Sequence, residues 1–329
     1  MSGDYQKELD QAIRCVRDAA RVCRSVRSEI TPGVLEKKDK SPVTVADFAS
    51  QAVVCRALAE AFPNDPVIGE EDAAALREGP QAALLGKVAE HVRAVAPDAD
   101  ERSVCQWIDH GGASAHAQRY WTLDPIDGTK GFLRNEQYAV ALALLVDGEI
   151  KVGVLGCPNL PVEPGAETPT GLLFTAIEGG GAACQRLDGE AAPRAIRVSE
   201  TADPAAARFC ESVESGHSSH SDADDVASRL GITAPPLRRD SQAKYATVAR
   251  GEAEIYLRLP TRADYVEKIW DHAAGVRVVT EAGGTVTDIT GKPLSFTHGA
   301  NLADNRGVVV TNGRFHDRVI EAIAAAGVK

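Results

Sequence analysis

The feature that most constrains this chain is the segment 124–129, Asp-Pro-Ile-Asp-Gly-Thr, which directly follows the apolar residues 120–123. Pro125 fixes φ and Gly128 permits a positive φ, so we expect a strand to end here in a tight bend. Both carboxylates then face one region of space, where like charges repel unless a cation lies between them or one binds a proton. An oxygen cluster of this kind is typical of Mg²⁺; the alternative is a polar turn with a capping aspartate.

Two further acidic elements have similar surroundings. Glu70 and Glu71 follow the apolar run 66–68, and Asp271 follows Trp270 at the start of a helical pattern that ends at two glycines, 283–284. Each element alone is also typical of a solvated face or a helix cap. Three acidic elements at the ends of strands and helices together indicate one shared site.

Composition restricts the class of protein. The 329 residues exceed one typical domain, and the net charge of −11 argues against extended nucleic-acid binding, which needs a basic face. No apolar run is long enough for a transmembrane helix, and the first residues lack the character of a signal or transit peptide. We therefore expect a cytoplasmic protein without a membrane partner, while an organellar form with a trimmed transit peptide stays open.

The seven cysteines are odd in number and lack CxxC spacing. This pattern predicts reduced, mostly structural thiols in a cytosol-like compartment. A regulatory disulfide stays open, and the sequence does not choose its pair.

Hydrophobic periodicity predicts an α+β domain over residues 1–202, followed by an α/β domain over residues 203–329. The predicted helices are 5–30, one beginning near 43–44, 81–95, 221–230, 241–250, 271–282 and 314–325. The predicted strands are 138–146, 150–155, 171–177, 182–186, 208–213, 254–259, 285–288 and 307–311.

The order of the acidic elements resembles the lithium-sensitive, Mg²⁺-dependent phosphatase superfamily over nearly the whole chain. The positions that carry this resemblance are Asp47, Glu70, Glu71, Asp124, Pro125, Ile126, Asp127, Gly128, Thr129, Trp270, Asp271, Gly283 and Gly284. The resemblance implies the two-domain layered αβαβα sandwich shared by inositol monophosphatases and fructose-1,6-bisphosphatases.

Four longer segments, 41–47, 127–134, 240–245 and 268–275, are similar to one branch, the 3′(2′),5′-bisphosphate nucleotidases of fungi and plants. Inositol monophosphatases typically carry Thr-Asn-Phe where this chain has Lys-Gly-Phe at 130–132. The resemblance implies removal of the 3′-phosphate of 3′-phosphoadenosine 5′-phosphate.

The resemblance also implies a set of metal ligands for two or three Mg²⁺ ions. One ion would lie between Glu70, Asp124 and the carbonyl of Ile126, and a second among Asp124, Asp127 and Asp271. Ions bridged in this way lie about 3.5–4 Å apart, where they activate an attacking water and stabilise the leaving oxygen. Glu71 is expected to accept a hydrogen bond rather than bind metal.

A hydroxyl has no proton affinity to spare at neutral pH, so we expect Thr129 to act with Asp47 as the final proton acceptor. The resemblance implies that the substrate is bound by Thr129, His217, Ser241, Lys244, Arg258 and Asp271. Two histidines, 217 and 220, have a spacing seen in zinc sites, but too few further ligands lie near them in the sequence. We expect a monomer whose partner is the nucleotide alone.

Two alternative functions stay open. One is a related phosphatase that acts on inositol phosphates or fructose bisphosphate, and overlap with inositol 1,4-bisphosphate is compatible with the sequence. The other is a catalytically silent nucleotide or redox sensor that kept the fold. The sequence also does not rank 3′-phosphoadenosine 5′-phosphate against its phosphosulfate.

Overall fold

A computed structural model describes residues 5–29, 45–166, 170–189, 191–213, 219–262 and 264–328. The α-helices are α1 (Gln6–Glu29), α2 (Val45–Ala61), α3 (Ala74–Arg77), α4 (Leu85–Val92), α5 (Glu101–His110), α6 (Thr129–Arg134), α7 (His220–Leu230), α8 (Ala243–Ala249), α9 (Ala273–Glu281) and α10 (His316–Ala325). Short 3₁₀ helices are η1 (Gly79–Leu84), η2 (Pro204–Ala206) and η3 (Ile269–Asp271).

The described strands form two sheets. The first has the order β1 (Val67–Gly69), β2 (Arg119–Asp127), β3 (Ala139–Val146), β4 (Glu149–Pro161), β5 (Thr170–Ile177), β6 (Gly181–Arg186) and β7 (Arg194–Ala195). The second has the order β11 (Thr285–Thr287), β12 (Val308–Thr311), β10 (Ile255–Arg258), β8 (Phe209–Glu211) and β9 (Leu237–Arg238).

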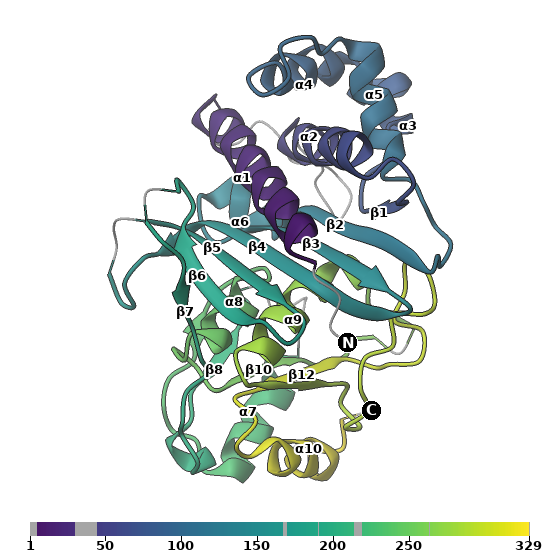
Figure 1. Ribbon diagram of the computed structural model, residues 1–329. Coiled ribbons are helices and arrows are strands. Elements are labelled where there is room, and N and C mark those ends of the chain that lie inside the picture. Colours follow the sequence, from purple (N-terminus) through teal and green to yellow (C-terminus); the bar gives the residue numbers. More distant parts are fainter. Residues whose placement is uncertain are drawn as a thin grey trace.

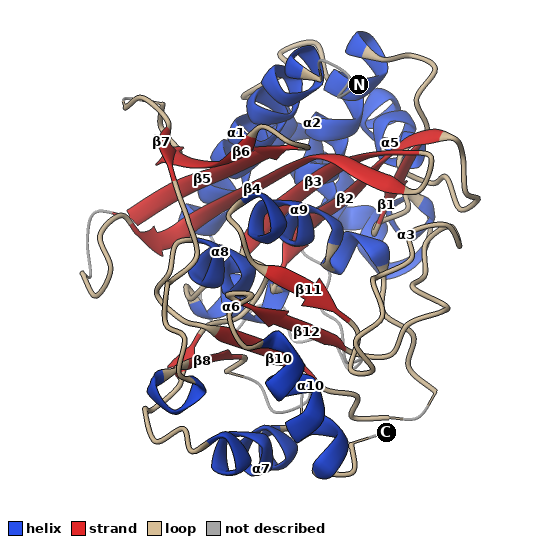
Figure 2. Ribbon diagram, turned by 60° about the horizontal axis from the view of Figure 1, so that its bottom comes forward, coloured by secondary structure: helices blue, strands red, loops and turns tan. Residues whose placement is uncertain are grey.

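Helices and sheets alternate in five layers (Figure 1). One face of the first sheet carries α1 and α2, with α4 and α5 beyond them, and α8 and α9 lie between the two sheets. The far face of the second sheet carries α7 and α10, as the turned view also shows (Figure 2). This is the expected layered αβαβα sandwich.

Alternation along the strands produces three separate cores. In β3, Val140, Leu142 and Leu144 pack toward α1 and α2, whereas the intervening residues 139, 141, 143 and 145 pack toward α8 and α9. In β12, residues 308 and 310 belong to the core between the two sheets, which contains α8 and α9. Val309 belongs to the core between the second sheet and helices α7 and α10. Because both faces are covered, these strands are apolar throughout.

Most predicted elements are present with boundaries within a few residues. The sequence prediction did not include the α-helix Glu101–His110, which Asp100 caps by accepting a hydrogen bond from the amide of Ser103. The predicted helix 81–95 is instead η1 followed by the shorter α4. All seven cysteines are free and buried, as expected for structural thiols.

The predicted bend between Asp124 and Thr129 is present, and it lies at the end of this segment. The strand β2 continues through Asp127, and its pairing with β3 shifts register between Asp124 and Asp127. The chain turns one residue later, at Gly128, whose φ of +87° is unfavourable for other residues. The bulge and the turn at Gly128 together direct the side chains here, while Pro125 lies within the strand and does not end it.

The packing of α9 on α8 predicts that Gly275→Ala is destabilising. A Cβ at this glycine would lie 2.4 Å from the ring of Tyr245, which is buried between the sheets. We expect a loss of about 1–3 kcal/mol in the free energy of unfolding, measured by urea denaturation. Gly86→Ala in α4 is the matched control, because its Cβ would meet only an ordinary 3.5 Å contact. Equal stability of the two variants would contradict this account.

Candidate active site

The end of β2 is fixed against the start of α2. Asp124 is 2% exposed, and the hydroxyl of Ser50 in α2 donates to the carbonyl of Pro125 at 2.8 Å. Asp47, 1% exposed, lies in the first turn of the same helix. The bulged strand and α2 thus bring two carboxylates from distant sequence positions to one region.

Glu70 is placed by a buried amide that sequence reasoning missed. The side-chain oxygen of Gln51 accepts from the amide of Glu71 at 3.0 Å, and its nitrogen donates to the carbonyls of Glu71 and Ile108. A Cβ at Gly69 or Gly111 would approach this amide to within 2.7 Å. Gln51 therefore fixes the backbone that follows β1, which is the backbone that carries Glu70.

A second buried amide, Gln242, joins the first sheet to η3 and α9 at the site. Its main-chain N–H donates to the Asp127 carboxylate, and its side chain donates to the carbonyl of Trp270 at 2.8 Å and accepts from the amide of Gly275 at 3.0 Å. Gln242 is 1% exposed. It thereby connects the end of β2 to the segment that carries Asp271. In the sequence, the one indication of a role for Gln242 was its place in the segment 240–245.

The turn after Asp127 packs closely on Ser241. A Cβ at Gly128 would lie 3.0 Å from the Cβ of Ser241, which itself has a positive φ of +66°. One residue on, the hydroxyl of Thr129 donates to the carbonyl of Ile126 at 3.2 Å. Thr129, Ile126 and Ser241 are thus contiguous with Asp127, while the predicted relay from Thr129 to Asp47 stays a prediction.

Removal from water and mutual repulsion both raise the pKa values of the acidic side chains. Removal from water, together with the charges of Glu70, Asp127, Asp271 and Asp47, raises the pKa of Asp124 well above its usual value. Removal from water and the neighbouring carboxylates likewise raise the pKa of Glu70, although its side chain is exposed. These groups lie close enough to one another that ionising all of them is costly.

Asp127 shows the same effect in a weaker form. Removal from water and the charge of Asp271 raise its pKa to about 6, whereas Lys244 and Arg258 oppose the shift. Two cations therefore reach the edge of the acidic cluster, and they compensate for only part of its charge.

One oxygen of the cluster lacks a partner. Among the described residues, Oδ1 of Asp124 is buried without a hydrogen-bond donor. A buried carboxylate oxygen without a donor is costly unless a cation binds it. The carboxylates of Glu70, Asp124, Asp127 and Asp271 with the Ile126 carbonyl form an all-oxygen set, which fits a hard divalent cation such as Mg²⁺.

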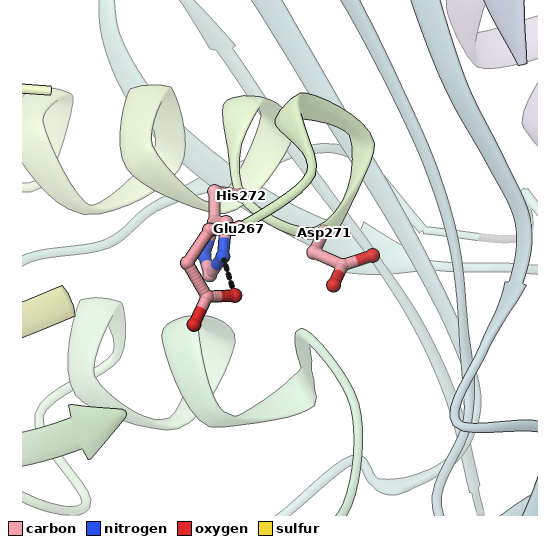
Figure 3. Close-up of side chains that lie close together, drawn as sticks. All are labelled: Glu267, Asp271 and His272. Atoms are coloured by element: carbon pink, nitrogen blue, oxygen red, sulfur yellow. Dashed lines mark hydrogen bonds and ion pairs between the residues drawn. The ribbon is translucent and has the colours of Figure 1, made fainter. Parts of the chain in front are cut away.

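Asp271 belongs to a second network, drawn in Figure 3 with Glu267 and His272. Ligand atoms of these three residues lie within 4.8 Å of one another, but the guanidinium of Arg258 contacts both carboxylates, at 2.8 Å to Glu267 and 3.1 Å to Asp271. Burial alone would raise the pKa of Glu267, yet Arg258 and His272 hold it at about 2. This group is an ion-pair network built around Arg258, and Asp271 is its link to the acidic cluster.

Lys244 lies deeper than a surface phosphate ligand would. It is 4% exposed, its ammonium lies 5.0 Å from the centre of the Tyr256 ring, and burial lowers its pKa although Asp127 opposes the shift. The backbone amides at this helix start are engaged within the protein. The N–H groups of residues 242, 243 and 244 bind Asp127, the Ser241 hydroxyl and the Ser241 carbonyl.

His217 lies outside the described residues, so its predicted role in substrate binding is untested. Glu71 contributes its backbone to the contacts with Gln51.

Comparison with known proteins decides the family. The model of the inositol monophosphatase family matches residues 4–327. The chain belongs to this family. A 3′(2′),5′-bisphosphate nucleotidase of Emericella nidulans is 44% identical over 97% of this chain and 98% of its own length. A 3′(2′),5′-bisphosphate nucleotidase of Schizosaccharomyces pombe is 43% identical over 99% of this chain and 96% of its own length.

Solved structures agree on the fold of this family member. The Thermotoga maritima IMPase superposes with a TM-score of 0.66 at 22% identity and covers 98% of each chain.

Within the described residues, no helix is long and apolar enough to cross a membrane.

The repulsion predicts how stability depends on pH without metal. The pKa of Asp127 is raised from 3.8 to about 6 in the folded protein. As the pH rises from about 4 to 6, the unfolded chain therefore loses this proton before the folded protein does, and the free energy of unfolding decreases. We expect Asp124→Asn, measured by urea denaturation in EDTA, to be more stable than wild type at pH 8. Each pKa unit relieved corresponds to about 1.4 kcal/mol.

The exposed Asp224→Asn variant in α7 is the control for this measurement. A stability of Asp124→Asn at or below that of the control at pH 8 would contradict the proposed repulsion.

Proposed function

We propose that this family member is a Mg²⁺-dependent 3′(2′),5′-bisphosphate nucleotidase that converts 3′-phosphoadenosine 5′-phosphate to AMP and phosphate. The observation that carries the proposal is the unpartnered Asp124 oxygen within a carboxylate cluster assembled from the first sheet, α2 and η3. Full-length relatives at 43–44% identity bear the nucleotidase name, which supports this substrate class. Activity on the phosphosulfate relative and inhibition by lithium belong to the same proposal.

We assign the metal ligands as the resemblance implies. Glu70, Asp124 and the Ile126 carbonyl would hold one Mg²⁺, and Asp124, Asp127 and Asp271 a second. When bound, such ions lower the pKa of water and stabilise charge on the phosphate and the leaving oxygen. The hydrogen bond from Gln242 to Asp127 would then fix one ligand oxygen and direct the other toward the ion.

Asp47 is the proposed proton acceptor. Its burial in the first turn of α2, near Asp124, suits a base that is shielded from bulk water. Thr129 would orient the attacking water through its hydroxyl, whose hydrogen bond to Ile126 places it beside a proposed ligand. The relay from Thr129 to Asp47 requires this hydroxyl to rotate away from the carbonyl.

The buried cations are proposed to balance charge for the substrate. Lys244 and Arg258 both lower the pKa of Asp127, so both are electrostatically coupled to the reaction centre. We assign the nucleotide pocket to these two residues with Thr129, Asp271, Ser241 and His217. Glu267 and Asp271 hold the guanidinium of Arg258 in a fixed orientation. Its remaining N–H groups can therefore bind the substrate without a change in the side-chain conformation.

The domain division is also a proposal. Strands of the first sheet end at Ala195 and those of the second begin at Phe209, which is compatible with domains over residues 1–202 and 203–329. We further propose a monomeric, cytoplasmic enzyme without a nucleic-acid partner, for which the net charge of −11 is supporting evidence.

Asp47→Asn tests the proposed base. We expect kcat to fall by about 10²–10⁴-fold, because general-base catalysis typically contributes this much. Mg²⁺ and AMP binding, measured by calorimetry, should stay within about twofold because the substitution keeps the side chain's shape. Retained turnover would contradict the role, and Asp72→Asn, at an exposed position near Glu70, is the control.

Phosphate release from two substrates tests the assignment itself. We expect 3′-phosphoadenosine 5′-phosphate to be hydrolysed at least tenfold faster, in kcat/KM, than inositol 1-phosphate. Release should require Mg²⁺, stop in EDTA and fall in millimolar Li⁺, which occupies a Mg²⁺ position without its charge. Preference for the inositol phosphate would overturn the nucleotide assignment, and metal-independent release would overturn the mechanism.

A further inference from the structure

A cavity lined by arginines lies away from the acidic cluster, where β4, β6 and β7 meet the end of α8. Its volume is about 220 Å³, and its lining consists of Val162, Pro164, Cys184, Arg194, Ala195, Ile196, Arg197 and Arg250. Three of these residues are arginines and none is acidic, in a chain of net charge −11. The lining therefore carries positive charge without a carboxylate of its own.

Arg250 is the buried member of this group. Its side chain is 7% exposed, its Nη1 donates to the carbonyl of Pro161 at 2.9 Å, and its Nε contacts Glu252. Among the described residues, its Nη2 is buried and has no hydrogen-bond partner. Burial lowers its pKa, so keeping the guanidinium charged here costs free energy. A buried donor without an acceptor calls for a ligand that accepts hydrogen bonds.

Glu252 does not neutralise the cavity. Its carboxylate is shared, because Arg239 donates to it at 2.7 Å while Arg250 contacts its other oxygen. The exposed Arg194 and Arg197 make no side-chain hydrogen bond or ion pair within the described part of the chain. One carboxylate therefore faces two buried guanidinium groups, and two more lie unpaired at the cavity.

We propose that this cavity binds a tetrahedral oxyanion of the phosphate or sulfate type through Arg194, Arg197 and Arg250. Guanidinium groups bind such oxygens with paired, charge-assisted hydrogen bonds. At about 30 Å³ for each water in the liquid, the cavity has room for roughly seven waters, which is enough for a five-atom oxyanion.

The site is distinct from the proposed reaction centre. Gln242, at the start of α8, binds Asp127, whereas Arg250 follows the last residue of that helix. Seven helical residues span about 10 Å. An anion on Arg250 would lie at the opposite end of α8 from the carboxylates.

Calorimetric titration of the Mg²⁺-loaded full-length protein with sodium sulfate, at constant ionic strength in chloride, tests the proposal. We expect Arg194→Ala/Arg197→Ala to weaken sulfate binding at this site at least tenfold. Arg102→Ala/Arg318→Ala, which removes two exposed arginines elsewhere, should leave it unchanged. The double variants spare Arg250, whose contacts with Pro161 and Glu252 also hold the fold together.

A parallel titration with AMP, which as product also binds the proposed reaction centre, separates a free oxyanion from a phosphate ester through a second AMP-binding event. Weakening of AMP binding in the Arg194→Ala/Arg197→Ala variant assigns the site to an ester, and weakening of sulfate binding alone assigns it to the free ion. The proposal would be overturned if wild type and this variant bound sulfate with the same affinity and also bound AMP with the same affinity. It would also be overturned if the control variant lost as much sulfate affinity as this variant. The readout is binding, so it is independent of which phosphate ester the enzyme hydrolyses.

Discussion

Repulsion among clustered carboxylates is the interaction on which the rest of this structure depends. Asp124, Asp127 and Glu70 all have raised pKa values because they are partly removed from water and lie close to other carboxylates. A fold that kept these groups together without a cation would lose stability as they ionise. Their arrangement is explained by a ligand of opposite charge, and the partnerless oxygen of Asp124 marks where that ligand would bind.

Neutral hydrogen bonds hold the charged groups in place. Gln51 fixes the backbone beside Glu70, and Gln242 ties Asp127 to the segment that carries Asp271. Both amides are buried with both ends bonded, so they keep their orientation at little cost in entropy. Gln242 joins the first sheet to η3 and α9, so the geometry of the site depends on how α8 and α9 pack.

Periodic and positional signals in the sequence predicted most elements and the acidic cluster, and the family resemblance implied the layers. The apolar run predicted a strand over residues 138–146, close to the observed β3, and the spacing of Asp124 and Asp127 predicted shared chemistry. The bulge in β2 and the helix 101–110 were not predicted, since a register shift depends on a partner strand and this helix is short. The bonding of Gln51 and the engaged amides at residues 242–244 depend on tertiary contacts that no local pattern contains.

Proton release on metal binding tests the central claim most directly. Mg²⁺ titrations at pH 6 in two buffers of different ionisation enthalpy give the number of protons released per protein. Because the pKa of Asp127 is about 6 and those of Asp124 and Glu70 are raised, binding at pH 6 must displace protons. The account predicts measurable release at pH 6 that decreases as the pH is raised. Tight Mg²⁺ binding at pH 6 with no proton released would contradict it.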